Sequence, residues 1–424
     1  MKLVIKGGRV IDPQSQLDAI MDVFVAAGKI VGMGTVPVGF HANREINAKD
    51  LVVCPGLVDL SARLREPGFE YKATLESEME AAVAGGITSL ACSPDTDPPL
   101  DEPGLVEMLK HRAKGLNQAH VYPIGALTQG LKGERLTEMA ELRDAGCVAF
   151  GQSDMPFTNA RVMMHAMQYA STFGFGVWLR PQDASLANGG VAHDGEVATR
   201  LGLPAISVCA ETVALSNIIL MARETGATVH LCRISSAEGV AMVRAARQQG
   251  LPVTCDVAAN HMHLSEMDIG FFDSNCHLVP PLRGLSDRNA LRAGLLDGTI
   301  DAVCSDHTPV DEDAKLLPFG EAEAGATGLE LLLPLTLKWA AEMRIPLVAA
   351  LAKVTMEPAR ILCIDAGHLS PGAAADLCIF DPDQYWKVEA AALKSQGKNT
   401  PFLDMELQGK VKYTLVNGNI VNQG

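Results

Sequence analysis

A carboxylate and two closely spaced histidines are the clearest candidates for chemistry in this chain. Asp306 follows the apolar run IDAVC, and His261 and His263 lie in ANHMHL just after PVTCDV. If that segment is extended, both imidazoles point to one face, which suits two ligands of a divalent metal. A bound metal would lower the pKa of its water and activate it for hydrolysis. One hypothesis is therefore a hydrolase whose metal site uses these three residues.

Arginines follow several other apolar runs. They are Arg63 and Arg65 in the stretch DLSARLREPG, Arg180 at the end of GVWLR and Arg233 at the end of TVHLCR. A guanidinium group offers no lone pair to a metal and does not exchange its proton near neutral pH. Buried guanidinium groups also need hydrogen-bonded counter-ions. A second hypothesis is that Arg63, Arg180 and Arg233 form a salt-bridge network. Its acids would be Asp59, Asp95 and Asp306.

Nearby polar residues allow structural interpretations as well. Arg65 could bind a ligand carboxylate through its guanidinium, or it could pair with the adjacent Glu66. Cys304 is interpreted as a packing residue, because no nucleophile motif or spaced histidine accompanies it. The segment 310–327 is polar and rich in acidic residues, which form either solvated surface or a contact with a partner.

The elements that must position these residues alternate along the chain. Between about 55 and 360, eight strand-like apolar runs alternate with helical stretches. The runs are VVCPGLVDL, ITSLACS, HVYPIGAL, CVAFG, GVWLR, TVHLCR, PVTCDV and IDAVCSD. Helices are expected over 72–85, 101–114, 136–145, 159–172, 211–224, 236–249 and 286–297. This α/β pattern predicts a TIM (β/α)8 barrel, whose chemistry lies at the C-terminal ends of the strands.

Both ends of the chain predict β-structure instead. Alternating runs such as LVIKGGRVID and GKVKYTLV are separated by turn dipeptides. We expect one small β-sandwich domain formed by both termini, from residues 1–54 and 363–424, around a barrel of residues 55–362.

Composition narrows the class of protein. The chain has 424 residues, a net charge of −15 and no long basic run, so neither a nucleic-acid partner nor a membrane partner is expected. No apolar run approaches membrane-spanning length, and the first residues read as a strand and turn. Its ten cysteines occur without a CxxC pair, which indicates reduced thiols and a cytoplasmic protein.

The sequence resembles the dihydroorotases of the cyclic amidohydrolase family along nearly its whole length. The matching motifs are IKGGRVIDP, CPGLVDL, LREPG, AGGIT, VPPLR, SDHTP, GLE, KNTPF and NGNIV. The resemblance implies that most of the family's metal-ligand positions hold other residues here. These degenerate positions are Ser61, Arg63, Gln152, Ser153, Arg180 and Arg233.

The resemblance also assigns the remaining site positions. Arg65 and Asp95 match positions that contact substrate, with Asp95 in place of an asparagine, and Val279 and Val310 replace a substrate-side asparagine and a final histidine. Asp306 matches the family's metal ligand and general base. A single carboxylate among arginines cannot hold a catalytic metal, so no cofactor is expected and Asp306 is expected to be vestigial.

The resemblance finally implies a role. The chain looks like the inactive dihydroorotase-like subunit that associates with the catalytic chain of aspartate transcarbamoylase in pyrimidine biosynthesis, as a structural part of homo- and hetero-oligomers. Two alternatives remain. One is an active cyclic amidohydrolase with a metal site rebuilt from His261, His263 and Asp306. The other is a sensor that binds carbamoyl-aspartate through Arg65 without turning it over.

Overall fold

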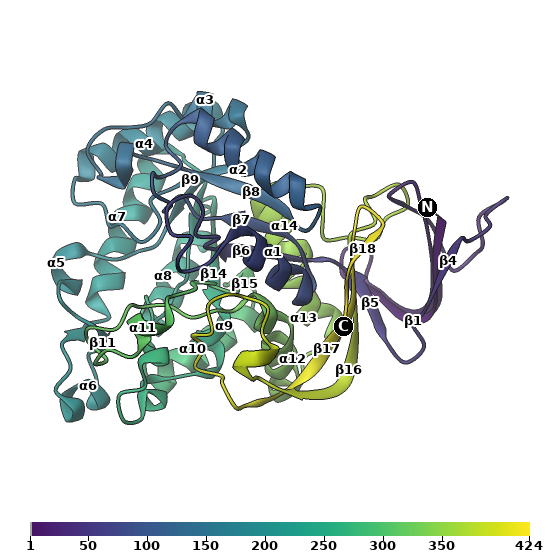
Figure 1. Cartoon of the computed structure of the whole chain (residues 1–424). Coiled ribbons are helices and arrows are strands. Elements are labelled where there is room, and N and C mark those ends of the chain that lie inside the picture. The colour runs from purple at the N-terminus through teal and green to yellow at the C-terminus, as the bar shows by residue number, and fades with distance from the viewer. Residues whose placement is uncertain (1) are drawn as a thin grey trace.

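The computed structural model describes residues 2–424, and its larger part is a barrel of eight parallel strands (Figure 1). The strands are β6 (Leu57–Ala62), β7 (Ile87–Cys92), β8 (His120–Ala126), β9 (Ala149–Gly151), β10 (Val177–Leu179), β13 (Val229–Leu231), β14 (Val253–Ala258) and β15 (Ala302–Cys304). They pair in chain order. A parallel bridge between Ala62 and His307 joins the first strand to the segment after the last. The predicted TIM barrel is confirmed.

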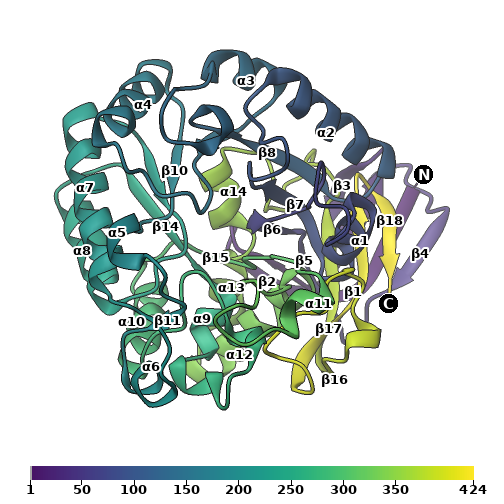
Figure 2. The same cartoon turned by 60° about the vertical axis from the view of Figure 1, so that its left-hand side comes forward.

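Helices surround the strands (Figure 2). Each of the seven predicted helices is present, within three residues of its expected ends: α1 (Leu75–Ala84), α2 (Pro103–Leu116), α3 (Met139–Ala145), α4 (Ala160–Phe173), α7 (Cys209–Thr225), α8 (Ala237–Gln248) and α10 (Leu285–Leu296). The sequence pattern did not resolve the last three, which are α12 (Leu332–Met343), α13 (Leu347–Ala352) and α14 (Met356–Leu362). Shorter elements are α5 (Ala184–Ala187), α6 (Glu196–Leu201), α9 (Ala259–His263), α11 (Glu312–Lys315), β11 (Ala192–His193) and β12 (Ala205–Ile206). No helix among residues 2–424 is long and apolar enough to cross a membrane.

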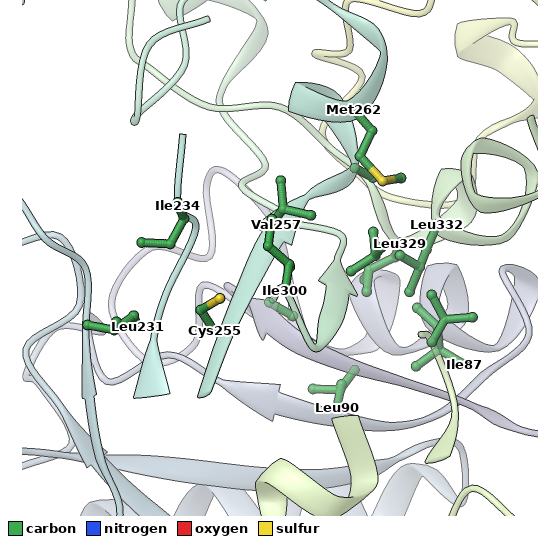
Figure 3. Close-up of a cluster of buried hydrophobic side chains, with 14 of the residues drawn as sticks. Ile87, Leu90, Leu231, Ile234, Cys255, Val257, Met262, Ile300, Leu329 and Leu332 are labelled. Carbon is green, nitrogen blue, oxygen red and sulfur yellow. The ribbon is translucent and has the colours of Figure 1, made fainter. Parts of the chain in front are cut away.

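The barrel core is built from strands and helices that are distant in sequence. Figure 3 shows Leu90 of β7, Leu231 of β13 and Val257 of β14 in one apolar cluster with Leu332 of α12, and each of these side chains is at most 1% exposed. Burying side chains of this size stabilises the fold by about 1.5–3 kcal/mol each. The strand ends that carry the polar residues are therefore held on a rigid scaffold.

The run VVCPGLVDL, predicted as one strand, is divided between two sheets. Val52–Pro55 forms β5 in the terminal sheet, and the barrel strand β6 begins at Leu57. Gly56 is the junction, because a Cβ atom there would lie 2.1 Å from Oγ1 of Thr88. Only glycine allows the chain to pass that close to the neighbouring strand.

Both ends of the chain meet in one further sheet, as predicted. Its order is β18-β17-β16-β5-β1-β2-β3, with β4 also paired to β1. The strands are β1 (Lys2–Asp12), β2 (Leu17–Ala26), β3 (Lys29–Met33), β4 (Arg44–Asn47), β16 (Leu377–Lys387), β17 (Glu406–Val416) and β18 (Asn419–Gln423). The two chain ends are joined where β16 pairs antiparallel with β5, which places Cys378 opposite Cys54.

Candidate functional site

Asp154 is the centre of the polar cluster at the C-terminal mouth of the barrel. It lies three residues beyond β9, after Ser153, whose φ of 51° turns the chain at the strand end. Its carboxylate accepts hydrogen bonds from Nη2 of Arg63 at 2.5 Å, from Nε of Arg180 at 2.5 Å and from Nη2 of Arg233. Arg180 also donates to the main-chain oxygen of Asp154 at 3.0 Å. One carboxylate therefore bridges three guanidinium groups.

Two further carboxylates complete the cluster. Nε of Arg63 donates to Asp95 at 2.7 Å, and Nη1 of Arg233 donates to Asp306 at 2.7 Å. Nη1 of Arg63 lies 3.7 Å from the same oxygen of Asp306. We call the six residues the arginine–carboxylate network: Arg63, Asp95, Asp154, Arg180, Arg233 and Asp306.

The arginine–carboxylate network is balanced in charge, with three cations and three anions. Its members follow six different barrel strands, namely β6, β7, β9, β10, β13 and β15. The three arginines are at most 9% exposed, so that each guanidinium depends on these protein partners instead of water. Charge balance is thus reached by side chains alone.

Burial and pairing have opposite effects on the network's acids. Burial disfavours ionisation of Asp154, but Arg233, Arg63 and Arg180 together hold its pKa far below the usual value. For Asp306, burial dominates and raises the pKa, although Arg233 and Arg63 oppose it. On the basic side, Asp154 and Asp306 raise the pKa of Arg233 well above its usual value despite its burial. Asp154 and Arg233 are therefore both charged near neutral pH.

The structure brings Asp95 and Asp306 to the predicted arginines, but the expectation for Asp59 is wrong. Asp59 lies within β6, fully buried, and its two oxygens accept from the backbone N–H of Ser305 at 2.7 Å and from its hydroxyl at 2.5 Å. Burial raises the pKa of Asp59 to about 6. Sequence reasoning missed Asp154, although an acid at the end of FGQSD was a visible signal.

Ser61, Ser153 and Gln152, which the resemblance compares with metal ligands, make uncharged hydrogen bonds. Ser61 Oγ lies 3.5 Å from Asp306, and Ser153 Oγ lies 3.0 Å from Ser93. The amide of Gln152 turns away from the network and donates to Thr128 and to the main-chain oxygen of Leu131, both at 2.8 Å. None of these contacts gives the network a further charge.

Arg65 differs from the other arginines because its guanidinium is only partly engaged. Its Nε donates to the main-chain oxygen of Pro309 at 2.9 Å, and its Nη2 lies 3.9 Å from Glu323, beyond hydrogen-bond length. The alternative pairing with Glu66 is wrong, since Glu66 pairs with Arg112 and accepts from the N–H of Leu75. Burial, together with the nearby Arg63, lowers the pKa of Arg65.

A cavity of about 370 Å³ opens above the network. Arg65 lines it together with Arg63, Arg180, Asp95 and Asp154. Its volume is within the range of small-molecule sites, and its lining combines charged side chains with apolar ones such as Val279.

The two histidines do not form the expected ligand pair. They lie in α9, a helical turn, whereas the prediction assumed an extended segment, and side chains two residues apart on a helix point in different directions. Nε2 of His261 lies 3.1 Å from the main-chain oxygen of Pro280, and Nε2 of His263 lies 2.8 Å from that of Leu335. Burial lowers the pKa of each histidine to about 4. Both are neutral structural residues.

The donors at the mouth do not fit a metal ion. Residues 2–424 contain no group of three or more His, Cys, Asp and Glu side chains that could hold one. Asp154 and Asp306 already accept from arginines, and the positions of Val279 and Val310 supply apolar side chains. A divalent cation would also be repelled by the three guanidinium groups.

Comparisons with known proteins identify relatives of this chain and agree with its barrel fold. Residues 50–239 match the family described as "Dihydro-orotase-like". The chain is 45% identical over 424 residues to the "Dihydroorotase-like protein" of Pseudomonas aeruginosa, and 40% identical over 423 residues to the "Dihydroorotase" of Geobacter sp. (strain M21), with 100% of each chain covered. Among solved structures, L-hydantoinase from Arthrobacter aurescens aligns with a TM-score of 0.89 at 23% identity, covering 99% of this chain and 96% of that one. The last likeness concerns the fold alone.

Proposed function

Because this chain belongs to the dihydroorotase-like family but has an arginine–carboxylate network at its barrel mouth, we propose that it is a catalytically inactive member. The observation that carries the proposal is the position of Asp154 between three arginines. Hydrolysis of a cyclic amide needs an activated water and a group that exchanges protons. The arginines supply neither, and Asp306 is engaged with Arg233.

We further propose that the chain is a structural subunit for the assembly of aspartate transcarbamoylase in the cytoplasm. The sequence motifs support this partner through the family resemblance. Loss of chemistry at the barrel mouth is compatible with a role in assembly, because function depends on particular sites and not on the fold as a whole.

Metal content, turnover and binding test this proposal on one sample. Protein purified without chelator is analysed for zinc by mass spectrometry, assayed with dihydroorotate, and mixed with the transcarbamoylase catalytic chain of the same cell. We expect zinc far below one ion per chain, no ring opening, and a complex on size-exclusion chromatography. Zinc near one ion per chain with ring-opening activity would instead support the rebuilt-site alternative. Failure of the two proteins to associate would remove the assembly role.

A second candidate function rests on Arg65. Its Nη2 lies 3.9 Å from the nearest acid it faces, Glu323, and it lines the 370 Å³ cavity. A guanidinium with spare donors can bind a carboxylate in a bidentate manner. The chain would then bind an acid such as carbamoyl-aspartate without converting it.

A further inference from the structure

Two loop segments at the barrel mouth expose apolar side chains. Residues 266–274 follow α9, and residues 311–321 follow β15. Phe271 is 89% exposed and Leu316 is 76% exposed, and a group of such side chains in one place is more informative than a single one. We call the exposed apolar set the apolar patch: Met267, Phe271, Phe272, Leu316 and Leu317.

The two segments are bound to each other at the base of the apolar patch. Ser274 Oγ donates to the main-chain oxygen of Lys315 at 2.6 Å, and Nζ of Lys315 donates to the main-chain oxygen of Ser274 at 2.9 Å. Lys315 directly precedes Leu316, and Ser274 lies two residues after Phe272. The bonds therefore bring both apolar groups to one region of the surface.

Each segment is anchored by a buried apolar side chain. Ile269 and Phe319 are 1% and 3% exposed and belong to the main core of the barrel. The exposed rings of Phe271 and Phe272 pack edge to face with centroids 5.3 Å apart. A fixed apolar surface costs less entropy to bury than a mobile one.

Acidic residues flank the apolar patch. They are Glu266, Asp268, Asp273, Asp311, Glu312, Asp313 and Glu321. Lys315 is the one basic residue in the same two segments, and it is buried with its Nζ on a carbonyl oxygen. The two segments that carry the apolar patch therefore have an excess of negative charge.

We propose that the apolar patch is a docking surface for a different protein chain whose contact face carries apolar side chains surrounded by lysines and arginines. Charge complementarity selects this occupant, because the acidic flanks attract a basic rim and raise the rate of encounter. A second copy would place the same acidic flanks against each other, on a chain of net charge −15. The inference rests on the proposed function, under which that chain is the transcarbamoylase catalytic chain.

Binding of the transcarbamoylase catalytic chain to paired variants tests this surface. In Phe271→Ser with Leu316→Ser we expect the affinity to fall at least about tenfold, because exposed aromatic and aliphatic anchors supply most binding energy at an interface. The matched control is Ile20→Ser with Leu296→Ser, which are 78% and 59% exposed elsewhere and should leave the affinity unchanged.

A second variant tests the charges. Glu312→Lys with Asp313→Lys should lower the association rate by about tenfold at low salt. The rate should also depend less on salt between 50 and 300 mM NaCl, because the attraction that salt screens has been removed. Glu107→Lys with Glu134→Lys, on exposed positions of α2 and of the loop before α3, is the control. Circular dichroism should give each variant the melting temperature of the unaltered chain.

The outcomes separate this inference from the proposed function. If the unaltered chain binds the transcarbamoylase and both patch variants bind equally well, the surface is overturned and the assembly role stands. If the unaltered chain does not bind, both fail. Two other results also overturn the inference. If sedimentation shows a dimer of the unaltered chain that Phe271→Ser with Leu316→Ser loses, the occupant is a second copy. If the unaltered chain binds phosphatidylglycerol vesicles and that variant does not, the occupant is a lipid surface.

Discussion

The carboxylate of Asp154 and the guanidinium of Arg233 meet at the barrel mouth, although strand β10 lies between β9 and β13, the strands that they follow. Arg180, at the end of β10, bonds to the same carboxylate at 2.5 Å. The contact thus ties three consecutive strand ends together. Arg233 extends the link to Asp306 after β15. Ion pairs thus join the ends of β9, β10, β13 and β15.

Asp154→Asn should destabilise the fold by about 2–4 kcal/mol, because it leaves three buried arginines with two acids. Chemical unfolding in urea measures the change. Asp144→Asn, on an exposed turn of α3, is the control and should stay within about 0.5 kcal/mol. Asp154→Asn with Arg180→Gln should recover part of the loss, since it restores the balance of charge. A loss below about 1 kcal/mol for Asp154→Asn would mean that water pairs with these arginines.

Restoring histidines should not restore activity. We expect no dihydroorotase turnover from a variant that combines Ser61→His, Arg63→His, Arg180→His and Arg233→His, with zinc added. The amide of Gln152 still points toward Thr128, and Val279 and Val310 still lack polar side chains. An active dihydroorotase in the same buffer provides the control. Measurable turnover would show that these remaining positions are not required.

Asp59 should make the free energy of unfolding depend on pH. Burial raises its pKa to about 6, from 3.8, so the folded state holds this proton more tightly than the unfolded chain. Stability from this group is full below about pH 4 and falls by up to about 3 kcal/mol as the pH rises through 6. Asp59→Asn should lack that decline, as shown by urea unfolding at several pH values. The prediction would be contradicted if the free energy of unfolding had the same pH dependence in the variant and in the unaltered chain. The lowered pKa of Asp154 acts in the opposite sense, below pH 4.

If the cavity binds a carboxylate ligand, carbamoyl-aspartate should raise the melting temperature. At about 100 times the dissociation constant, the ligand adds about 2.7 kcal/mol of stability. Arg65→Met should abolish the shift, because Arg65 is the cavity arginine whose guanidinium is only partly engaged. Arg112→Met is the control, since Arg112 is half exposed and pairs with Glu66. An equal shift in both variants, or none in the unaltered chain, would remove the sensor function.

The sequence predicted what depends on local pattern. Each of the eight apolar runs overlaps a barrel strand, and helices such as α4 and α8 lie within one residue of their expected ends. Arg63, Arg180 and Arg233 could be placed at one mouth because the carboxyl ends of parallel strands share one edge of the sheet. The absence of metal-binding side chains at those positions was also readable from residue type alone.

Tertiary structure decided which charges meet. Arg233 and Asp306 are 73 residues apart, and Arg63 and Asp154 are 91 apart, so no local rule relates them. Asp59 lies within β6 and is fully buried against Ser305, whereas Asp154 lies three residues beyond β9 and reaches three arginines. A shift of one or two residues along a strand end sets which side chain faces the mouth, and ion pairing falls off within a few ångström. Only the packed barrel determines those distances.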